Sequence, residues 1–213
     1  MPKFPDPPSV EALRTIKPET RRLRQGTVLA RVYFTAGPSP TRWNEFRRYG
    51  PTNARFDHHV PDPLGQPREQ ERALLYCATG AETCFAEVFQ ETRRIDRIRK
   101  APWLVVFRLE RDLELLDLTG AYPTRAGASM AISSGSRVRA RAWARAWYEA
   151  FPDLQGIHYA SSMNANEPAI ALTDRAEKQE PLPRHPEFNR PLADDALLDV
   201  LKQCASRLGY GLL

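Results

Sequence analysis

The chain has 213 residues, 42% of them hydrophobic, and its 31 basic and 26 acidic residues give a net charge of +5. This length fits one domain with terminal additions, and the hydrophobic share suffices for a core, which argues against a disordered chain. No stretch approaches the roughly 20 apolar residues that span a bilayer, and the opening MPKFPDPPSVEALR lacks the apolar centre of a signal peptide. We therefore expect a cytoplasmic protein with no membrane partner.

The basic excess and the cysteines narrow the chemistry only slightly. A positive balance favours an anionic ligand such as a nucleotide, a nucleic acid or an acidic partner. Basic and acidic residues are interspersed, however, which also suits a surface that keeps the protein soluble. Cys77, Cys84 and Cys204 form no CxxC pair, so neither a disulfide framework nor a metal site is expected. Cys77 and Cys84 lie in apolar sequence and are expected to be buried thiols.

The first third of the chain predicts two strands separated by loops. Residues 1–25 suggest a proline-rich lead and a short helix. Residues 27–34 (TVLARVYF) are rich in β-branched and aromatic residues and predict a strand, and residues 74–79 (LLYCAT) predict a second. Residues 37–50 predict a loop, and residues 53–59 (NARFDHH) form a short polar segment whose composition suggests function.

A helix is predicted from about residue 80 to residue 94. Thr79 and Glu82 have the spacing of a capping box, in which the hydroxyl and the carboxylate satisfy free backbone N–H groups. Apolar residues then follow at helical spacing: Ala81, Cys84, Phe85, Val88 and Phe89. We expect this face to pack on a sheet.

The arginine-rich segment 137–150 (RVRARAWARAWYEA) predicts a second helix, which ends at Phe151-Pro152. Its apolar stripe is expected at four-residue intervals, flanked by Trp143 and Trp147, with the arginines on the other face. The stripe would consist of Val138, Ala142, Ala146 and Ala150.

The other elements complete a mixed fold. Strands are predicted at residues 103–109, 113–118, 156–161 and 169–173, and a terminal helix at residues 192–208. Because strands and helices do not alternate strictly, the predicted fold class is α+β rather than a doubly wound sheet.

Common nucleotide and catalytic motifs are missing from the sequence. The one GxG, at Gly209, has no following helix, and no GxxxxGK[ST] loop occurs. The segment around Ser129 lacks the final glycine of a nucleophile elbow. His58 and His59 are adjacent, so their side chains would diverge on a strand and a metal site is not expected. Any nucleotide chemistry must therefore use a different kind of site.

Five polar residues share a recognisable arrangement. They are Arg31 at the end of the first strand (VLARVYF), Arg55 (NARFDHH), Tyr76 (LLYCAT), Glu87 on the following helix (CFAEVF) and Ser161 (GIHYASS). In this arrangement the chain resembles the RES family, named for its Arg, Glu and Ser, over roughly residues 26–175. The resemblance implies an ADP-ribosyltransferase-like fold, with a mixed or antiparallel β core flanked by helices.

The chain departs from the commoner family pattern in two places. The family's Gly-Gly-Arg-Trp-Asn segment is Ala-Arg-Phe-Asp at residues 54–57, and a proline-rich insertion follows it. Ala160 stands where Pro often precedes the serine, which leaves Ser161 and Ser162 both open as the family serine.

From the extent of the resemblance we expect an N-terminal extension at 1–25, a RES-like NAD-binding catalytic domain at 26–180 and a C-terminal helical extension at 181–213.

The resemblance implies NAD⁺ as the substrate, with no metal, and cleavage of the bond between nicotinamide and ribose. That step develops positive charge on the ribose, as in glycoside hydrolysis, and a carboxylate beside the sugar stabilises it. Glu87 is the candidate, although a solvated helix glutamate is the alternative. Arg31 and Arg55 would bind the pyrophosphate through their guanidinium groups; for Arg31 a structural ion pair is the alternative.

The remaining candidates line the expected pocket. Tyr76 would stack on nicotinamide or ribose, or else belong to the core. Ser161 would hydrogen-bond the ribose or the amide, or else form a turn. His58, with Tyr159 and Trp43, is a further candidate for contact with the ligand.

Three functions remain open. The first, implied by the resemblance, is an NAD⁺ glycohydrolase or phosphorylase, with water or inorganic phosphate as acceptor, acting as a toxin with an antitoxin partner. The second is a mono-ADP-ribosyltransferase that modifies a protein. The third, of a different class, is a nucleic-acid-binding or regulatory module that uses the basic residues 137–145, although direct contact with nucleic acid is not expected.

Overall fold

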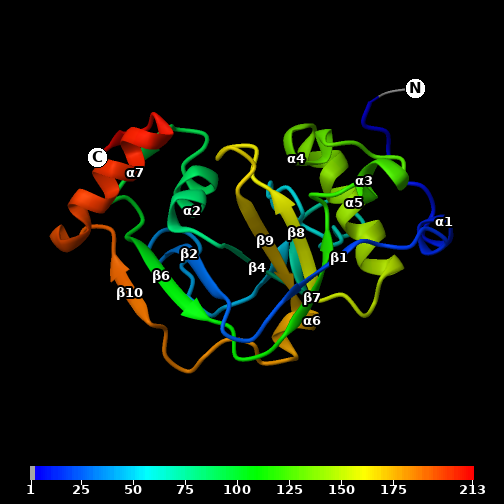
Figure 1. Ribbon diagram of the computed structural model, residues 1–213, viewed down its shortest axis with the longest axis horizontal. Helices are drawn as coiled ribbons and strands as arrows, with labels where there is room; N and C mark the ends of the chain where they lie inside the picture. Colours follow the sequence, from blue (N-terminus) through cyan, green and yellow to red (C-terminus); the bar gives the residue numbers. More distant parts are fainter. Residues whose placement is uncertain (1–2) are drawn as a thin grey trace.

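The computed structural model describes residues 3–213 and has a mixed sheet with helices packed on it (Figure 1). All neighbouring strands of the sheet pair antiparallel except β7 and β8, which are parallel. The strand order is β1 (Thr20–Leu23), β7 (Leu113–Asp117), β8 (Gly156–Ala160), β9 (Pro168–Thr173), β4 (Arg68–Ala78), β2 (Val28–Phe34), β6 (Pro102–Arg108) and β10 (Phe188–Pro191), with β3 (Arg47–Gly50) beside β4. The predicted α+β class is confirmed.

Two groups of helices cover the sheet at opposite ends (Figure 1). One group comprises α1 (Val10–Arg14), α3 (Tyr122–Arg125), α4 (Ala131–Ser134) and α5 (Arg137–Ala150). The other comprises α2 (Ala81–Val88) and α7 (Leu198–Leu208), the latter preceded by a 3-10 turn at Asp195–Leu197. Short α6 (Asp174–Glu177) follows β9, and β5 (Arg94–Ile95) pairs with β11 (Gly211–Leu212) in a separate parallel ribbon.

The sheet is weakly joined at one point, between β2 and β4. β2 pairs with β6 along its whole length, from Val28 opposite Arg108 to Phe34 opposite Pro102. With β4 it shares a single pair, Ala30 opposite Ala78. The two strands therefore diverge beyond this pair and leave room between them.

The segments outside the expected 26–180 domain contribute strands to the main sheet. β1 comes from the expected N-terminal extension and pairs with β7, and β10 comes from the expected C-terminal extension and pairs with β6. Residues 1–2 of the N-terminal segment lie outside the described residues. The predicted loop at 37–50 was wrong at its end, because residues 47–50 form β3 against β4.

Helix α2 was predicted correctly in kind, but its ends were wrong. It begins after Gly80, whose backbone caps it without a side-chain hydrogen bond, so the Thr79–Glu82 capping box is not formed. The Glu82 carboxylate instead pairs with Arg207 of α7 at 2.7 Å. The helix stops at Val88 rather than residue 94 because Phe89 leaves helical geometry (φ −102°, ψ 15°).

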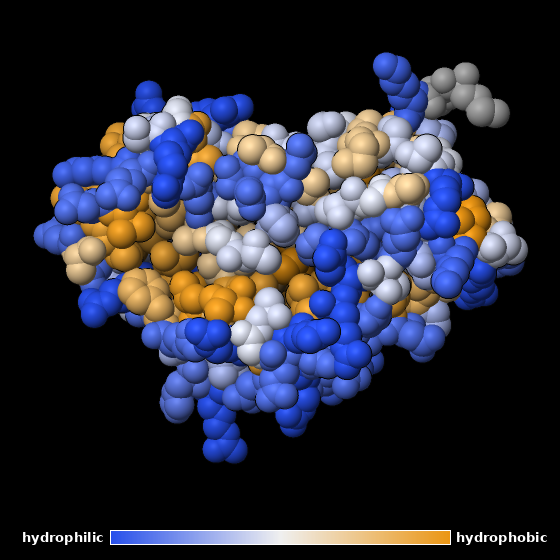
Figure 2. Space-filling view, in the orientation of Figure 1, coloured by the Kyte–Doolittle hydropathy of each residue, from blue (hydrophilic) through white to orange (hydrophobic). Residues whose placement is uncertain are grey.

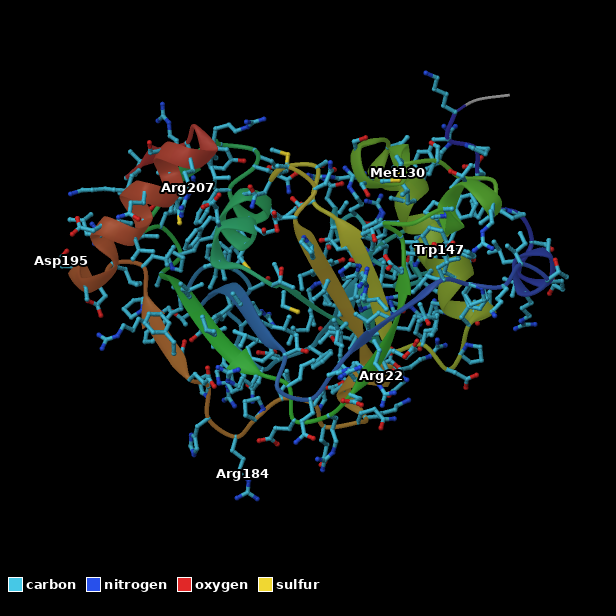
Figure 3. The ribbon with its side chains drawn as sticks, in the orientation of Figure 1. Arg22, Met130, Trp147, Arg184, Asp195 and Arg207 are labelled. Carbon is cyan, nitrogen blue, oxygen red and sulfur yellow. The ribbon has the colours of Figure 1, made fainter. Side chains whose placement is uncertain are left out.

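Helix α5 has the predicted bounds but a different buried face. Val138, expected in the apolar stripe, is 65% exposed, whereas Trp143 is fully buried. The buried residues of this helix are Ala140, Trp143, Ala144, Ala146, Trp147 and Ala150. The two tryptophans, expected at the flank, thus form the centre of the face, because large aromatic rings remove the most apolar area from water; Figure 3 labels Trp147 on this helix.

The three cysteines are free and buried, which confirms the expectation for Cys77 and Cys84. Within residues 3–213 no helix has the length and apolar character needed to cross a bilayer.

The packing of α2 predicts how a single truncation affects stability. Phe85 is fully buried between α2, β2 and α7, whereas Val88 on the same helix is 38% exposed. Replacing Phe85 by Ala should lower the free energy of unfolding by about 3–5 kcal/mol, through lost burial and the cavity left behind. Val88→Ala should cost about 1 kcal/mol or less. Urea denaturation of both variants measures the difference, and equal losses would contradict this packing.

Candidate functional site

A cleft of about 390 Å³ opens where β2 and β4 diverge, next to α2. Four of the predicted residues line it: Arg31 from β2, Arg55, Tyr76 from β4 and Glu87 from α2. Its size lies within the range of about 300–1,000 Å³ that is usual for ligand pockets. Figure 2 shows apolar side chains gathered in the middle of one face, over β2 and β6, between hydrophilic rims. The structure thus brings these four residues to one place.

The Glu87 carboxylate is held by a serine from across the cleft. Ser161 Oγ donates to Glu87 Oε1 at 2.6 Å. The same hydroxyl accepts the backbone N–H groups of Met163 and Asn164, both at 3.2 Å. Since these two donors occupy the oxygen as an acceptor, its proton is directed at the carboxylate. Ser161 therefore fixes one oxygen of Glu87.

The turn after β8 identifies which of the two adjacent serines makes this contact. Ser161 is fully buried at the end of β8, whereas Ser162 is exposed. Asn164 of the same turn donates through Nδ2 to Thr83 Oγ1 on α2 at 3.0 Å. Two side-chain hydrogen bonds thus tie this turn to α2, and Ser161 is the serine that contacts the glutamate.

Arg31 has no carboxylate partner in the described part of the chain. Its Nη1 donates to the backbone oxygens of Trp43, at 3.3 Å, and Glu45, at 3.1 Å. The side chain is 9% exposed, and burial lowers the pKa of Arg31 to about 10, so that it remains charged at neutral pH. The structural ion pair considered from the sequence is therefore not formed among residues 3–213.

Arg55 is held in the same way from the other side of the cleft. Its Nη1 donates to the backbone oxygens of Gly135, at 2.7 Å, and Ile132, at 3.4 Å, in the α4 region. Burial, and then the neighbouring charge of Arg137, lower the pKa of Arg55. Backbone oxygens fix its position without neutralising its charge.

Two further arginines, Arg47 and Arg137, line the cleft and were not predicted as site residues. Arg137 donates to Gln90 at 2.7 Å and lies 3.4 Å from Glu91. The sequence placed it within a basic helix but gave no sign that the N-terminus of α5 returns to α2. Arg47 was part of a predicted loop. The sequence did not reveal that it pairs opposite Leu74 of β4, which places it at the cleft.

Arg47 is positioned by Asp57, which is fully buried. The ion pair measures 2.8 Å, and Asp57 also accepts from Thr52 and lies 2.5 Å from His59 Nδ1. Burial opposes ionisation, but the hydrogen bond from His59 and the charge of Arg47 hold the pKa of Asp57 well below its usual range. The cleft is thus lined by four guanidinium groups and, within the described residues, one carboxylate, that of Glu87.

Tyr76 presents an unsatisfied hydroxyl. The oxygen is buried and has no hydrogen-bond partner in the described part of the chain, although the ring lines the cleft. Burial, and then the charge of Asp57, raise the pKa of Tyr76, so the hydroxyl stays protonated. A buried hydroxyl without a partner costs about 1–3 kcal/mol, which a water or a ligand atom would relieve. Tyr159 of β8 also lines the cleft.

His58 does not join the others. It lines a separate cavity of about 20 Å³, where its ring stacks on Tyr148 at 4.3 Å between centroids. Its Nε2 lies 3.6 Å from Asp174, and burial lowers the pKa of His58. The side chain of Trp43 packs on Phe107, and only its backbone oxygen contacts Arg31. Neither residue is among those that line the cleft.

The His58 cluster predicts an acid-sensitive contribution to stability. Burial opposes ionisation of Asp174, but contacts from His58 and Tyr148 outweigh it and lower the pKa of Asp174 to about 2. A carboxyl whose pKa falls on folding stabilises the fold above its unfolded pKa, near 4, and loses this as pH falls toward 2. Asp174→Asn should therefore reduce the free energy of unfolding by about 2 kcal/mol at pH 7.

The difference between wild type and Asp174→Asn should shrink between pH 4 and pH 2, measured by urea denaturation across this range. The matched control is Asp153→Asn, because Asp153 is exposed and its carboxylate makes no hydrogen bond within residues 3–213. A difference that stays constant down to pH 2 would contradict the assignment.

Comparisons with known proteins identify the family and a similar fold. A search of curated proteins gives no match. A chain of the crystal structure of the M. tuberculosis MbcT–MbcA toxin–antitoxin complex is similar in fold, with a TM-score of 0.57 and 17% identity over 91% of this chain and 96% of that chain. The family model described as RES domain matches residues 20–193. Because this match covers most of the sequence, the chain belongs to the RES domain family.

Proposed function

We propose that the chain cleaves NAD⁺ at the bond between nicotinamide and ribose. The proposal rests on the presence of positively charged arginines and one negatively charged glutamate in the same cleft. Within residues 3–213 Arg31 and Arg55 form no ion pair, and Glu87 faces the same cleft with one oxygen fixed by Ser161. A dinucleotide offers both complements, a diphosphate for the guanidinium groups and a ribose that becomes cationic as the bond breaks.

The chemistry requires little from the protein beyond placement and charge. The bond between ribose C1′ and the nicotinamide nitrogen breaks, and its electron pair leaves with nicotinamide, which becomes neutral. The positive charge moves to the ribose, where Glu87 stabilises it electrostatically. Ser161 engages the first oxygen of Glu87, and the second, Oε2, accepts only a long hydrogen bond of 3.5 Å from Gln90 Nε2 among the described residues, so this second oxygen would accept from the ribose 2′-hydroxyl. An acceptor oxygen then attacks C1′.

Tyr76 supports a bound ligand in this position. Its ring lines the same cleft as Arg31 and Glu87, and its hydroxyl lacks a partner among the described residues. An aromatic ring can stack on nicotinamide, and a phenol can donate to a phosphate oxygen. We assign it the role of positioning the nicotinamide ribose.

The acceptor decides between related activities. Water gives a glycohydrolase, inorganic phosphate gives a phosphorylase, and a protein side chain gives a mono-ADP-ribosyltransferase. All three share the bond-breaking step that Glu87 would stabilise. The arginines that line the cleft suit inorganic phosphate, and water needs no binding site of its own, so we place these two acceptors before a protein side chain.

A nucleic-acid-binding role for α5 has less support. Arg137 donates to Gln90, Arg139 to Asp6 and the Phe4 oxygen, and Arg141 to Asn53. These arginines bind groups of the protein itself, so α5 does not present a free basic stripe for a phosphate backbone.

We further propose that the chain acts as a toxin that an antitoxin protein neutralises. Two observations support this: membership of the RES domain family, and a fold similar to that of a chain in a toxin–antitoxin complex. Depletion of a cofactor needed throughout metabolism would by itself halt growth.

Removing the carboxylate should abolish the proposed turnover. With Glu87→Gln, NAD⁺ consumption followed by liquid chromatography should fall at least a hundredfold, since one charge aimed at the developing cation contributes about 3–4 kcal/mol. Glu82→Gln on the same helix should keep wild-type turnover, because Glu82 pairs with Arg207 outside the cleft. Equal turnover in wild type and Glu87→Gln would exclude this mechanism. Mass analysis of the products with and without phosphate identifies the acceptor.

Growth of a bacterial host tests the toxin proposal separately. Induction of the wild-type chain should stop growth and lower cellular NAD⁺, whereas Glu87→Gln expressed at the same level should do neither. Arrest by both variants would mean that toxicity does not arise from this site.

A further inference from the structure

A second hollow, of about 640 Å³, adjoins the cleft. Phe34 at the end of β2 and Val88 at the end of α2 line both, so the two hollows meet across these apolar side chains. The far wall comes from the segment between β5 and β6 and from Leu213. The C-terminus lies beside α7, at the same end of the molecule as α2 (Figure 1).

Three basic side chains line the second hollow: Arg94, Arg99 and Lys100. All three are exposed, and among residues 3–213 none of them forms an ion pair or a side-chain hydrogen bond; Arg94 contacts Thr92 only through its backbone. Some exposed arginines elsewhere have carboxylate partners, as Arg22 has Asp112 and Arg190 has Asp194, and others, such as Arg111, form no ion pair among the described residues; what sets these three apart is that they line one hollow. A group of three free cations beside the cleft is therefore a local excess of positive charge.

The two acidic residues of this hollow are already engaged. Glu91 lies 3.4 Å from Arg137 at the cleft. Asp96 accepts the backbone N–H groups of Ile98 and Arg99, at 2.9 and 2.8 Å, which lowers its pKa. Among residues 3–213 neither carboxylate forms an ion pair with the three cations, although the charge of Arg99 also lowers the pKa of Asp96.

The backbone fixes Lys100 at its place in the wall. Lys100 and Ala101 both have positive φ, at 65° and 46°, a conformation that costs a non-glycine residue about 1–2 kcal/mol. Their carbonyl oxygens accept from Ala36 and Thr35, each at 3.1 Å. The Lys100 stem packs on Gly37, where an added Cβ would lie 3.2 Å from Lys100 Cγ. Contacts with the end of β2 thus hold this strained turn in position.

The role that we infer for these three cations rests on the proposed function. The diphosphate of NAD⁺ would bind Arg31 and Arg55 in the cleft, and nicotinamide would lie by Glu87. The cleft, at about 390 Å³, lies near the lower end of the range for ligand pockets, and we place the adenosine end of a bound dinucleotide outside it. The adenosine end would then cross Phe34, on which adenine can stack, and reach the second hollow.

The adenosine of NAD⁺ carries no charge and would leave the three cations without a partner. A phosphate on its 2′-oxygen supplies one, since Arg and Lys are the usual ligands of phosphate groups. We propose that Arg94, Arg99 and Lys100 bind the 2′-phosphate of NADP⁺, and that the enzyme cleaves NADP⁺ as well as NAD⁺. Cleavage breaks the same bond and releases nicotinamide, because the 2′-phosphate lies at the other end of the molecule.

The test compares the two dinucleotides on one triple variant, R94Q/R99Q/K100Q. Wild type should cleave NADP⁺ with a kcat/KM at least equal to that for NAD⁺. In the variant, kcat/KM for NADP⁺ should fall at least tenfold through a rise in KM, with kcat unchanged, and that for NAD⁺ should change less than threefold. The control, R111Q/R184Q/K17Q, removes the same number of positive charges at other surface positions. It should leave kcat/KM unchanged for both NADP⁺ and NAD⁺. Figure 3 shows Arg184 pointing away from the body of the protein.

A binding measurement gives an independent readout. Adenosine 2′,5′-bisphosphate should bind wild type at least tenfold more tightly than 5′-AMP in calorimetry, and the triple variant should lose this preference. Equal affinities, no cleavage of NADP⁺ by an enzyme that cleaves NAD⁺, or equal losses for both substrates would overturn the inference and leave the proposed function standing. Cleavage of neither dinucleotide would overturn both.

Discussion

The site depends on one hydrogen bond, from Ser161 to Glu87. It joins α2 to the turn between β8 and β9, two elements that approach each other where the sheet divides between β2 and β4. Together with the hydrogen bond from Asn164 to Thr83, it ties the helix that carries the glutamate to this turn, in addition to the apolar face of α2 and the ion pair of Glu82 with Arg207. The same hydrogen bond thus fixes the position of α2 and the orientation of the Glu87 carboxylate, which faces the cleft.

Charge in the cleft is arranged by backbone oxygens and by one buried acid. Arg31 and Arg55 are fixed by carbonyl groups, which orient a guanidinium but leave its full charge for a ligand. Arg47 is fixed by Asp57, so its charge is partly spent inside the protein. Arg31 and Arg55, which form no ion pair among the described residues, are therefore suited to binding an anion. Arg47 and Arg137, which have carboxylate partners, instead shape the wall of the cleft.

The sequence predicted the elements that carry the site better than the contacts that complete it. β-branched and aromatic runs located β2, β6, β8 and β9, and the five-residue arrangement shared with the RES family singled out Arg31 and Glu87. β3 and the role of Arg47 were not predicted. The four residues of β3, RRYG, show no alternation of apolar and polar residues, and they form a strand only because they pair with β4. The capping box at Thr79 failed because Glu82 forms a tertiary ion pair that local spacing cannot reveal. His58 resembled a site residue in sequence, but the chain turns its ring toward Tyr148.

The single parallel pair in the main sheet, β7 with β8, has a consequence for the order of events during synthesis. Parallel neighbours need a long crossover, here α3, α4 and α5, and contacts so distant along the chain form slowly. Arg31 emerges from the ribosome well before Ser161, and Glu87 lacks its hydrogen bond from Ser161 until the crossover has folded and β8 has docked. A nascent chain cut short before this point would hold most of the cleft's residues and still lack an organised centre.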